Sequence, residues 1–126
     1  MIVSVCLFIL AGVLDAIMDV ISTKWPVSIF SKIRNEKVID WCNPIHSWPN
    51  KWKNGNINNG EKFFGSSTFL VWLTDLWHLS KMLMLLSVCI GAALFTPWIN
   101  IFLDAFILYL AYTVTFQLFY GKILLK

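Results

Sequence analysis

Residues 2–22 read IVSVCLFILAGVLDAIMDVIS, an apolar run that is interrupted by two acidic side chains, Asp15 and Asp19. About 20 predominantly apolar residues are enough for an α-helix to span the hydrocarbon core of a bilayer. Lys24 and the breaker Pro26 follow directly and change the character of the chain. We therefore predict a first transmembrane helix over about residues 2–23.

The composition of the 126-residue chain agrees with a membrane protein. Hydrophobic residues make up 58% of the sequence and charged residues 13%, whereas a typical soluble domain has about 25% charged residues. The length and the uniform composition indicate a single membrane domain, residues 1–126. The formal net charge is +3, and the basic residues lie mostly outside the apolar segments, so we do not expect nucleic acid as a partner.

Two further apolar segments follow in the second half of the chain. The serines of GSST (65–68) favour a helix start, because a Ser hydroxyl accepts hydrogen bonds from the free amides of a first turn. We predict a second helix over about residues 66–95 and, since Pro97 suits a first helical turn, a third over about residues 97–121. The short turn between them predicts an antiparallel hairpin. The predicted fold is an all-α integral membrane protein with three transmembrane helices.

The segment between the first two helices, residues 24–65, is basic and rich in tryptophan. Its basic residues are Lys24, Lys32, Arg34, Lys37, Lys51, Lys53 and Lys62. Its tryptophans are Trp25, Trp41, Trp48 and Trp52. Indole rings beside cations are favoured in the headgroup layer of a membrane. We predict an interfacial loop that these tryptophans anchor, with a short helix within residues 27–39 and a turn-forming stretch at 54–60.

The distribution of basic residues predicts the orientation of the chain. Three crossings place the 24–65 loop and the C-terminus on one side, which collects nine of the ten basic residues of the sequence. By the positive-inside rule, that side is cytoplasmic and the N-terminus is outside. The expected location is a membrane that the chain crosses several times.

Six ionisable residues fall inside the predicted helices: Asp15, Asp19, Asp75, His78, Lys81 and Asp104. Each costs about 2.5–3.5 kcal/mol at mid-bilayer on insertion scales, so each should face the bundle interior and have a partner. Counting about 1.5 Å of rise per residue from the predicted helix ends gives Asp15 and Asp75 a similar depth, and gives Lys81 and Asp104 a similar, greater depth. We therefore predict that helices from all three crossings bring these residues to one polar site, with Lys81 and Asp104 as a buried ion pair.

The chemistry of this set suits an ion. Asp15, Asp19, Asp75 and His78 offer three carboxylates and one imidazole, which fit a divalent cofactor such as Zn, Mn or Fe. The predicted function is the binding of an ion or small polar ligand at this site. If the chain is an enzyme, which the sequence leaves open, the metal would activate water and Asp75 or Asp19 would act as base.

Two alternatives fit the same residues. The first is an oligomeric ion or proton channel or transporter, in which the Asp and His side chains relay protons. Three helices are too few to enclose a pore, so this alternative requires a homo-oligomer. The second is a membrane scaffold or accessory subunit, in which the polar pairs fix helix register and the basic loop contacts lipid headgroups or a membrane-protein partner. The expected partners are thus the lipid bilayer and further copies of the chain.

Overall fold

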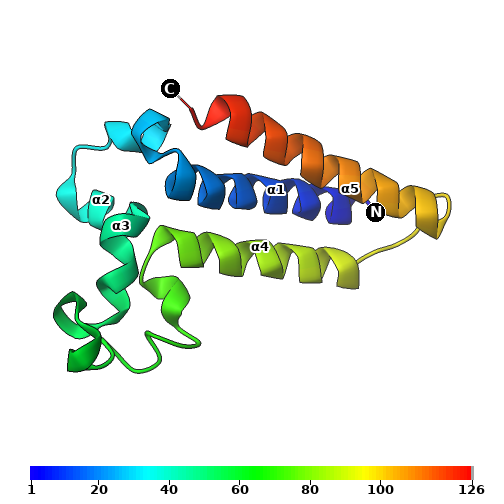
Figure 1. Cartoon of the computed structure of the whole chain (residues 1–126). Helices are drawn as coiled ribbons and strands as arrows, with labels where there is room; N and C mark the ends of the chain where they lie inside the picture. The colour runs from blue at the N-terminus through cyan, green and yellow to red at the C-terminus, as the bar shows by residue number, and fades with distance from the viewer. Residues whose placement is uncertain (126) are drawn as a thin grey trace.

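The computed structural model describes residues 1–125, and the regular structure within them is helical throughout (Figure 1). Three long helices form a bundle: α1 (Ile2–Thr23), α4 (Leu76–Ala93) and α5 (Ile101–Leu118). A π-helical segment, η7 (Phe119–Ile123), continues α5. All three long helices have the length and the apolar composition to cross a membrane. The predicted all-helical class with three candidate spans is confirmed.

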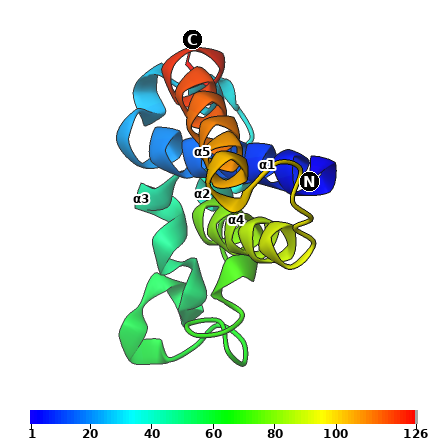
Figure 2. The same ribbon diagram turned by 90° about the vertical axis from the view of Figure 1, so that its right-hand side faces the viewer.

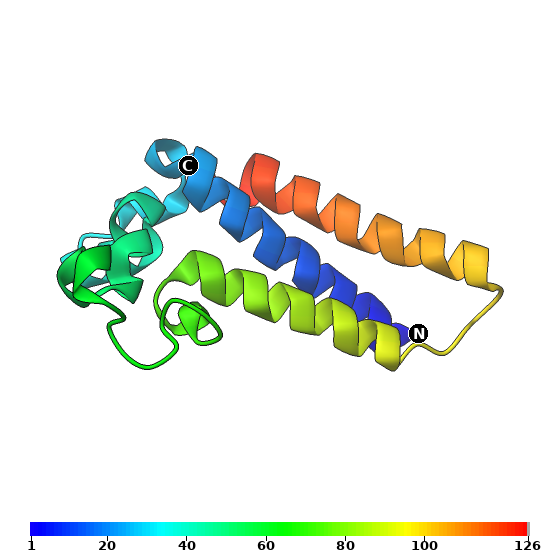
Figure 3. The ribbon, with the colours of Figure 1, turned by 60° about the horizontal axis from the view of Figure 1, so that its bottom comes forward.

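Helix α1 is the central element of the bundle. It packs against α4 and against α5, whereas α4 and α5 make few direct contacts with each other. Figure 2 shows α5 and α4 on either side of α1, and Figure 3 shows the same order of the three helices from another side. Helices α4 and α5 run antiparallel, as the short connector predicts, but α1 separates them instead of leaving them as a packed pair.

Two glycines allow α1 to approach its neighbours closely. A Cβ atom at Gly12 would lie 2.6 Å from the backbone oxygen of Tyr112 in α5, which is too close for any side chain. At Gly91 in α4, a Cβ would lie 3.2 Å from the ring of Phe8 in α1. Small residues of this kind let helix backbones pack tightly in membrane bundles.

Residues 24–75 fold into a cap at the end of the bundle where α1 ends, α4 begins and the C-terminal end of the chain lies (Figure 1). The cap contains the short α-helices α2 (Glu36–Cys42) and α3 (Pro44–Ser47). Its 3-10 helices are η1 (Trp25–Val27), η2 (Ile29–Lys32), η3 (Trp48–Lys51), η4 (Lys53–Gly55), η5 (Ile57–Asn59) and η6 (Val71–Leu73). The predicted interfacial helix within residues 27–39 corresponds in part to η2 and α2. The loop is thus folded, with hydrogen-bonded turns along most of its length.

Helix α4 begins at Leu76 and not at residue 66, which corrects the predicted second helix of 66–95. The physical reason is that the polar groups of GSST are bound within the cap. The carboxylate of Glu61 accepts hydrogen bonds from the backbone N–H groups of Gly65 and Ser67 and from the Ser67 hydroxyl. These groups stabilise a turn, in which Gly65 has a φ of +79°, instead of starting a helix.

Helix α5 begins at Ile101 and not near residue 97, which shortens the predicted third helix of 97–121 at its start. Asn100 is the N-cap, since its side chain accepts a hydrogen bond from the first turn of α5. The connector before it is held by the carboxylate of Asp104, which accepts a hydrogen bond of 2.9 Å from the backbone N–H of Trp98. These two side chains satisfy backbone donors that would otherwise be unpaired at the start of the helix.

Candidate functional site

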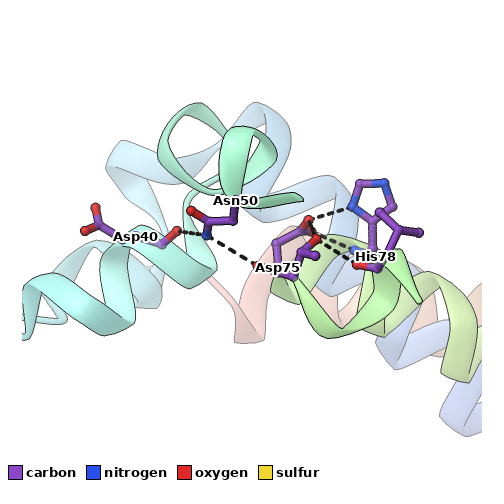
Figure 4. A network of polar contacts seen from close by, with 6 residues as sticks. Asp40, Asn50, Asp75 and His78 are labelled. Atoms are coloured by element: carbon purple, nitrogen blue, oxygen red, sulfur yellow. Dashed lines mark hydrogen bonds and ion pairs between the residues drawn. The ribbon is translucent and has the colours of Figure 1, made fainter. Parts of the chain in front are cut away.

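The carboxylate of Asp75 lies at the junction of the cap and α4, and it is fully buried. Asp75 is the N-cap of α4, and its Oδ1 accepts a hydrogen bond of 2.9 Å from the backbone N–H of His78. Its Oδ2 lies 2.7 Å from Nδ1 of the His78 ring and 3.0 Å from the hydroxyl of Thr74 (Figure 4). An Asp at this position stabilises the start of a helix, and here the same carboxylate also fixes an imidazole.

The partners of Asp75 determine which nitrogen of His78 carries a hydrogen. A carboxylate only accepts hydrogen bonds, so Nδ1 donates to Asp75. The ring nitrogen Nε2 has no hydrogen-bond partner among residues 1–125. In the neutral imidazole Nε2 is then an acceptor, and in the protonated ring it is a second donor. Asp75 and His78 form an oriented pair with one ring nitrogen available for a ligand.

The Thr74 hydroxyl has two acceptors within reach, the backbone oxygen of Val71 at 2.7 Å and Oδ2 of Asp75 at 3.0 Å. The Val71 oxygen already accepts a hydrogen bond from the Thr74 backbone N–H. Donation to Asp75 therefore leaves no acceptor unsatisfied, and it gives the buried carboxylate a third donor. Such a set of donors compensates the cost of burying a charge.

His78 lies on the wall of a cavity of about 300 Å³ beside α4, and its side chain is 21% exposed. The cavity is lined by Phe69, Val71, Trp72, His78, Lys81, Met82 and Leu85. Lys81 follows His78 by three residues, so both side chains lie on one face of the helix. The ammonium group of Lys81 is 5.0 Å from the centre of the Trp77 ring, within the range of a cation-π contact. The cavity thus combines an imidazole, an ammonium group and mostly apolar walls.

The cap is tied to the start of α4 by Asn50. Its side-chain amide donates hydrogen bonds to the backbone oxygens of Asp40 in α2, at 2.9 Å, and of Thr74, at 3.3 Å (Figure 4). The Trp48 ring packs edge-on against Trp77, with ring centres 6.2 Å apart. These contacts hold the Asp75–His78 pair against a folded cap instead of a mobile loop.

The structure does not bring the four predicted metal ligands together. Asp75 and His78 are paired at the start of α4, while Asp15 lies in α1 and accepts a hydrogen bond of 2.6 Å from the hydroxyl of Tyr112 in α5. Asp19, one turn along α1 from Asp15, is exposed. Within the described residues 1–125, no group of three or more His, Cys, Asp or Glu side chains is placed to hold a metal ion. The depth count that predicted convergence began α4 ten residues too early.

Lys81 and Asp104 do not form the predicted ion pair. Lys81 lies in the second turn of α4, next to the cap, whereas Asp104 lies in the first turn of α5, at the opposite end of the bundle. About 18 Å of helix rise separates Lys81 from the end of α4. The fully buried Asp104 is instead paired with backbone N–H groups of the connector. Its place at a helix start explains why this carboxylate in an apolar segment has no cationic partner among residues 1–125.

All four predicted anchoring tryptophans lie in the cap. Trp25 stacks with Phe30, with ring centres 6.4 Å apart. The ammonium nitrogen of Lys51 lies 6.0 Å from the centre of the Trp52 ring. Trp41 belongs to α2, and Trp48 is 48% exposed. A further cation-π contact, Lys24 over Tyr120 at 3.6 Å, joins the cap to η7.

Sequence reasoning missed two side chains, Asn50, which supports the site, and Tyr112, which pairs with the predicted site residue Asp15. It also missed the start of α4 at Thr74-Asp75. The dipeptide Thr74-Asp75 is a recognisable N-cap signal before an apolar helix, but it competes with the GSST signal at 65–68. Asn50 and Tyr112 have no such local signal, because their partners are 24 and 97 residues away.

Comparison with models of protein families, with characterised proteins and with solved structures finds no match to this chain. The role of the site therefore has to be argued from its own geometry.

Proposed function

We propose that this chain is an integral membrane protein that binds an acidic amphiphile, such as a fatty acid, in the cavity beside α4. His78 and Lys81 would contact the acidic headgroup, and Asp75 would position His78. The observation that carries the proposal is the orientation of His78: a buried carboxylate binds Nδ1, so Nε2 remains for a ligand on the wall of a cavity that Lys81 also lines. This retains three of the six residues of the predicted polar-ligand site, Asp75, His78 and Lys81.

Insertion into a membrane is supported by the surface of the long helices. Large apolar side chains of α4 and α5 face outward, among them Leu85 at 51%, Ile101 at 68% and Phe102 at 85% exposure. Soluble monomers rarely expose large contiguous apolar surfaces, whereas lipid chains solvate such surfaces. This surface supports the proposed insertion of the bundle into a bilayer, in which α1 would be the most buried of the three long helices.

The proposed orientation places the cap on the cytoplasmic side. The cap and the C-terminal end of α5 share one end of the bundle, and the N-terminus and the connector 94–100 share the other (Figure 1). The cap end carries the basic segment, which the positive-inside rule assigns to the cytoplasm. Since α4 starts at the cap, the Asp75–His78 pair would lie at the membrane border and not at mid-bilayer.

The lining of the cavity indicates the class of ligand. Phe69, Trp72 and Leu85 supply apolar surface for an alkyl chain. Lys81 has three N–H donors, and protonated His78 adds one through Nε2, so both can donate to a carboxylate or phosphate headgroup. At the membrane border such a headgroup would stay in the polar layer while its chain follows α4 into the bilayer.

The test uses brominated fatty acid, which quenches tryptophan fluorescence on binding, and a brominated fatty alcohol of equal length as the uncharged control. We expect the purified protein in neutral micelles to bind the acid at least tenfold more tightly than the alcohol. Lys81→Gln and His78→Gln should each weaken acid binding about tenfold, the effect of one lost charge-assisted hydrogen bond. The matched control is Lys53→Gln, an exposed cap lysine outside the cavity. Equal affinity for acid and alcohol, or equal effects of Lys81→Gln and Lys53→Gln, would overturn the proposal.

A second candidate is metal binding by His78, and one observation favours it. Metal-bound histidines usually donate their other ring N–H to a carboxylate, as His78 does to Asp75. Further ligands would come from a second copy of the chain or from the bound molecule. Stoichiometric metal in gently purified protein, lost in an Asp75→Asn, His78→Ala double variant, would support this candidate, and the absence of metal from both would exclude it.

A further inference from the structure

A second cavity, of about 350 Å³, lies within the cap and shares no lining residue with the cavity of His78. Its walls come from α2, from the segment around Asn50 and from the stretch that leads into α4. The basic residues on its wall are Lys37 and Lys62, and the aromatic ones are Trp41 and Phe63. The fold brings the two lysines to one cavity from positions 25 residues apart in the chain.

We propose that this cap cavity binds a phosphate ester, with Lys37 and Lys62 as the contacting residues. Two ammonium groups provide up to six N–H donors, and lysine binds phosphate as a compact point charge. The acidic residue on the wall is Asp40, whose carboxylate lies 3.7 Å from the ring of His46, a residue outside the cavity. The charge that meets a ligand is therefore net positive, with one acid against two cations.

The backbone around the cavity is held in place before any ligand arrives. Asn50 uses its side-chain amide to join α2 to the backbone of Thr74, and both of these segments contribute to the wall. The Lys62 backbone N–H donates a hydrogen bond of 2.9 Å to the backbone oxygen of Lys51, which fixes the segment that carries Lys62. A preorganised site loses less conformational entropy on binding than a loop that must fold around its ligand.

Two sources can supply the phosphate ester. The cap follows directly on the apolar bundle, so the headgroup of a phospholipid is within its reach if the bundle is inserted. A soluble phosphate ester from the aqueous side has the same recognition chemistry. The proposal does not depend on the acidic-amphiphile site, because the two cavities use different cations.

The test follows the side-chain amide signals of Asn50 and the indole signal of Trp41 by NMR, with the full chain in neutral maltoside micelles. The probes are glycerol phosphate, short-chain phosphatidylglycerol and, as the control without phosphate, short-chain diacylglycerol. We expect saturable shifts with at least one phosphate probe and none with diacylglycerol. Glycerol phosphate acting alone would identify a soluble ester as the source, and phosphatidylglycerol acting alone would identify a lipid.

The matched variants are the double substitution Lys37→Gln, Lys62→Gln and the control Lys32→Gln, Lys53→Gln, which removes the same charge from exposed cap lysines outside the cavity. The first should weaken phosphate binding at least tenfold, and the second should leave it within twofold. His78→Gln should have no effect, which separates this result from the test of the amphiphile site. Equal losses in both double variants, or no saturable shift with either phosphate probe, would overturn the proposal.

Discussion

Replacing Gly12 by alanine tests the packing that organises the bundle. The new Cβ would lie 2.6 Å from the backbone oxygen of Tyr112, while ordinary van der Waals contact begins at 3.4 Å. Because the atom in the way is backbone, α5 must move by the difference, 0.8 Å, or α1 must distort. Overpacking of this kind costs about 1–3 kcal/mol, and the higher helix propensity of alanine offsets about 1 kcal/mol of it.

The matched control is Gly121→Ala, in the η7 segment, where a Cβ would meet no atom within 4 Å. Both variants remove one helical glycine, so the difference between their free energies of unfolding isolates the packing strain. We expect Gly12→Ala to be less stable than Gly121→Ala by about 1–3 kcal/mol. The measurement is unfolding in mixed micelles with increasing dodecyl sulfate, followed by far-UV circular dichroism.

A double-mutant cycle with Tyr112→Phe locates the strain. The Tyr112 hydroxyl donates to Asp15, one helical turn from Gly12, at 2.6 Å. A hydrogen bond to a charged group contributes about 1.5–3 kcal/mol to stability. If Gly12→Ala displaces α5, the Tyr112–Asp15 hydrogen bond is already weakened in that variant. Tyr112→Phe should therefore cost less in the Gly12→Ala background than in the native chain. Two results together would refute the close α1–α5 crossing. Gly12→Ala would be as stable as Gly121→Ala, and the effects of Gly12→Ala and Tyr112→Phe on the free energy of unfolding would be additive.

Two further predictions concern carboxylates outside the ligand site. Hydrogen bonds from the Ser67 hydroxyl and from the Gly65 and Ser67 amides lower the pKa of Glu61. The ionised carboxylate therefore stabilises this turn at any pH above the pKa that Glu61 has in the unfolded chain. This stabilisation is lost as the pH falls through the lowered pKa of the folded chain. The amide shifts of Gly65 and Ser67 should titrate together at that point, and Glu61→Gln should abolish the titration; pH-independent shifts in the native chain would contradict the contact. Asp104→Ala should destabilise the chain by about 1–3 kcal/mol, because it removes the charged acceptor of the part-buried hydrogen bond from the backbone N–H of Trp98. Asp104→Asn should recover most of this loss in the same unfolding assay. Native-like stability of Asp104→Ala would contradict that role.

The first helix was predictable because its evidence is local. The apolar run and the change of character at Lys24 give bounds that match α1, Ile2–Thr23. The class of fold follows from three such runs. The basic, Trp-rich character of residues 24–65 predicts a segment outside the bundle, but the cap extends ten residues further, to residue 75. What the sequence does not show is the arrangement of α4 and α5 around α1, since that depends on the contacts of Gly12 and Gly91 with residues far away in the chain.

The start of α4 could not be predicted because two signals compete. The serines at 66 and 67 resemble N-caps, but their hydrogen bonds go to the Lys51 backbone oxygen and to Glu61, which are close only in the folded cap. The ten residues between the predicted and the observed start correspond to about 15 Å of helix rise. Every depth estimate on this helix inherited that error, including those that paired Asp75 with Asp15 and Lys81 with Asp104.

The corrected start of α4 also changes the structural role of Asp75, from a carboxylate within a membrane helix to the N-cap of α4. In the middle of a membrane helix an aspartate needs a cation or a metal to offset its burial, and this requirement was the basis for the predicted metal site. As an N-cap, Asp75 has donors from Thr74, from the His78 backbone and from the His78 ring, all within four residues. The carboxylate is then satisfied without an ion, and the group left with unused capacity is His78, next to Lys81. A site whose available groups are cationic or proton-accepting suits an acid better than a metal ion, which is why the geometry favours an acidic amphiphile over the ion that the composition of the helices suggested.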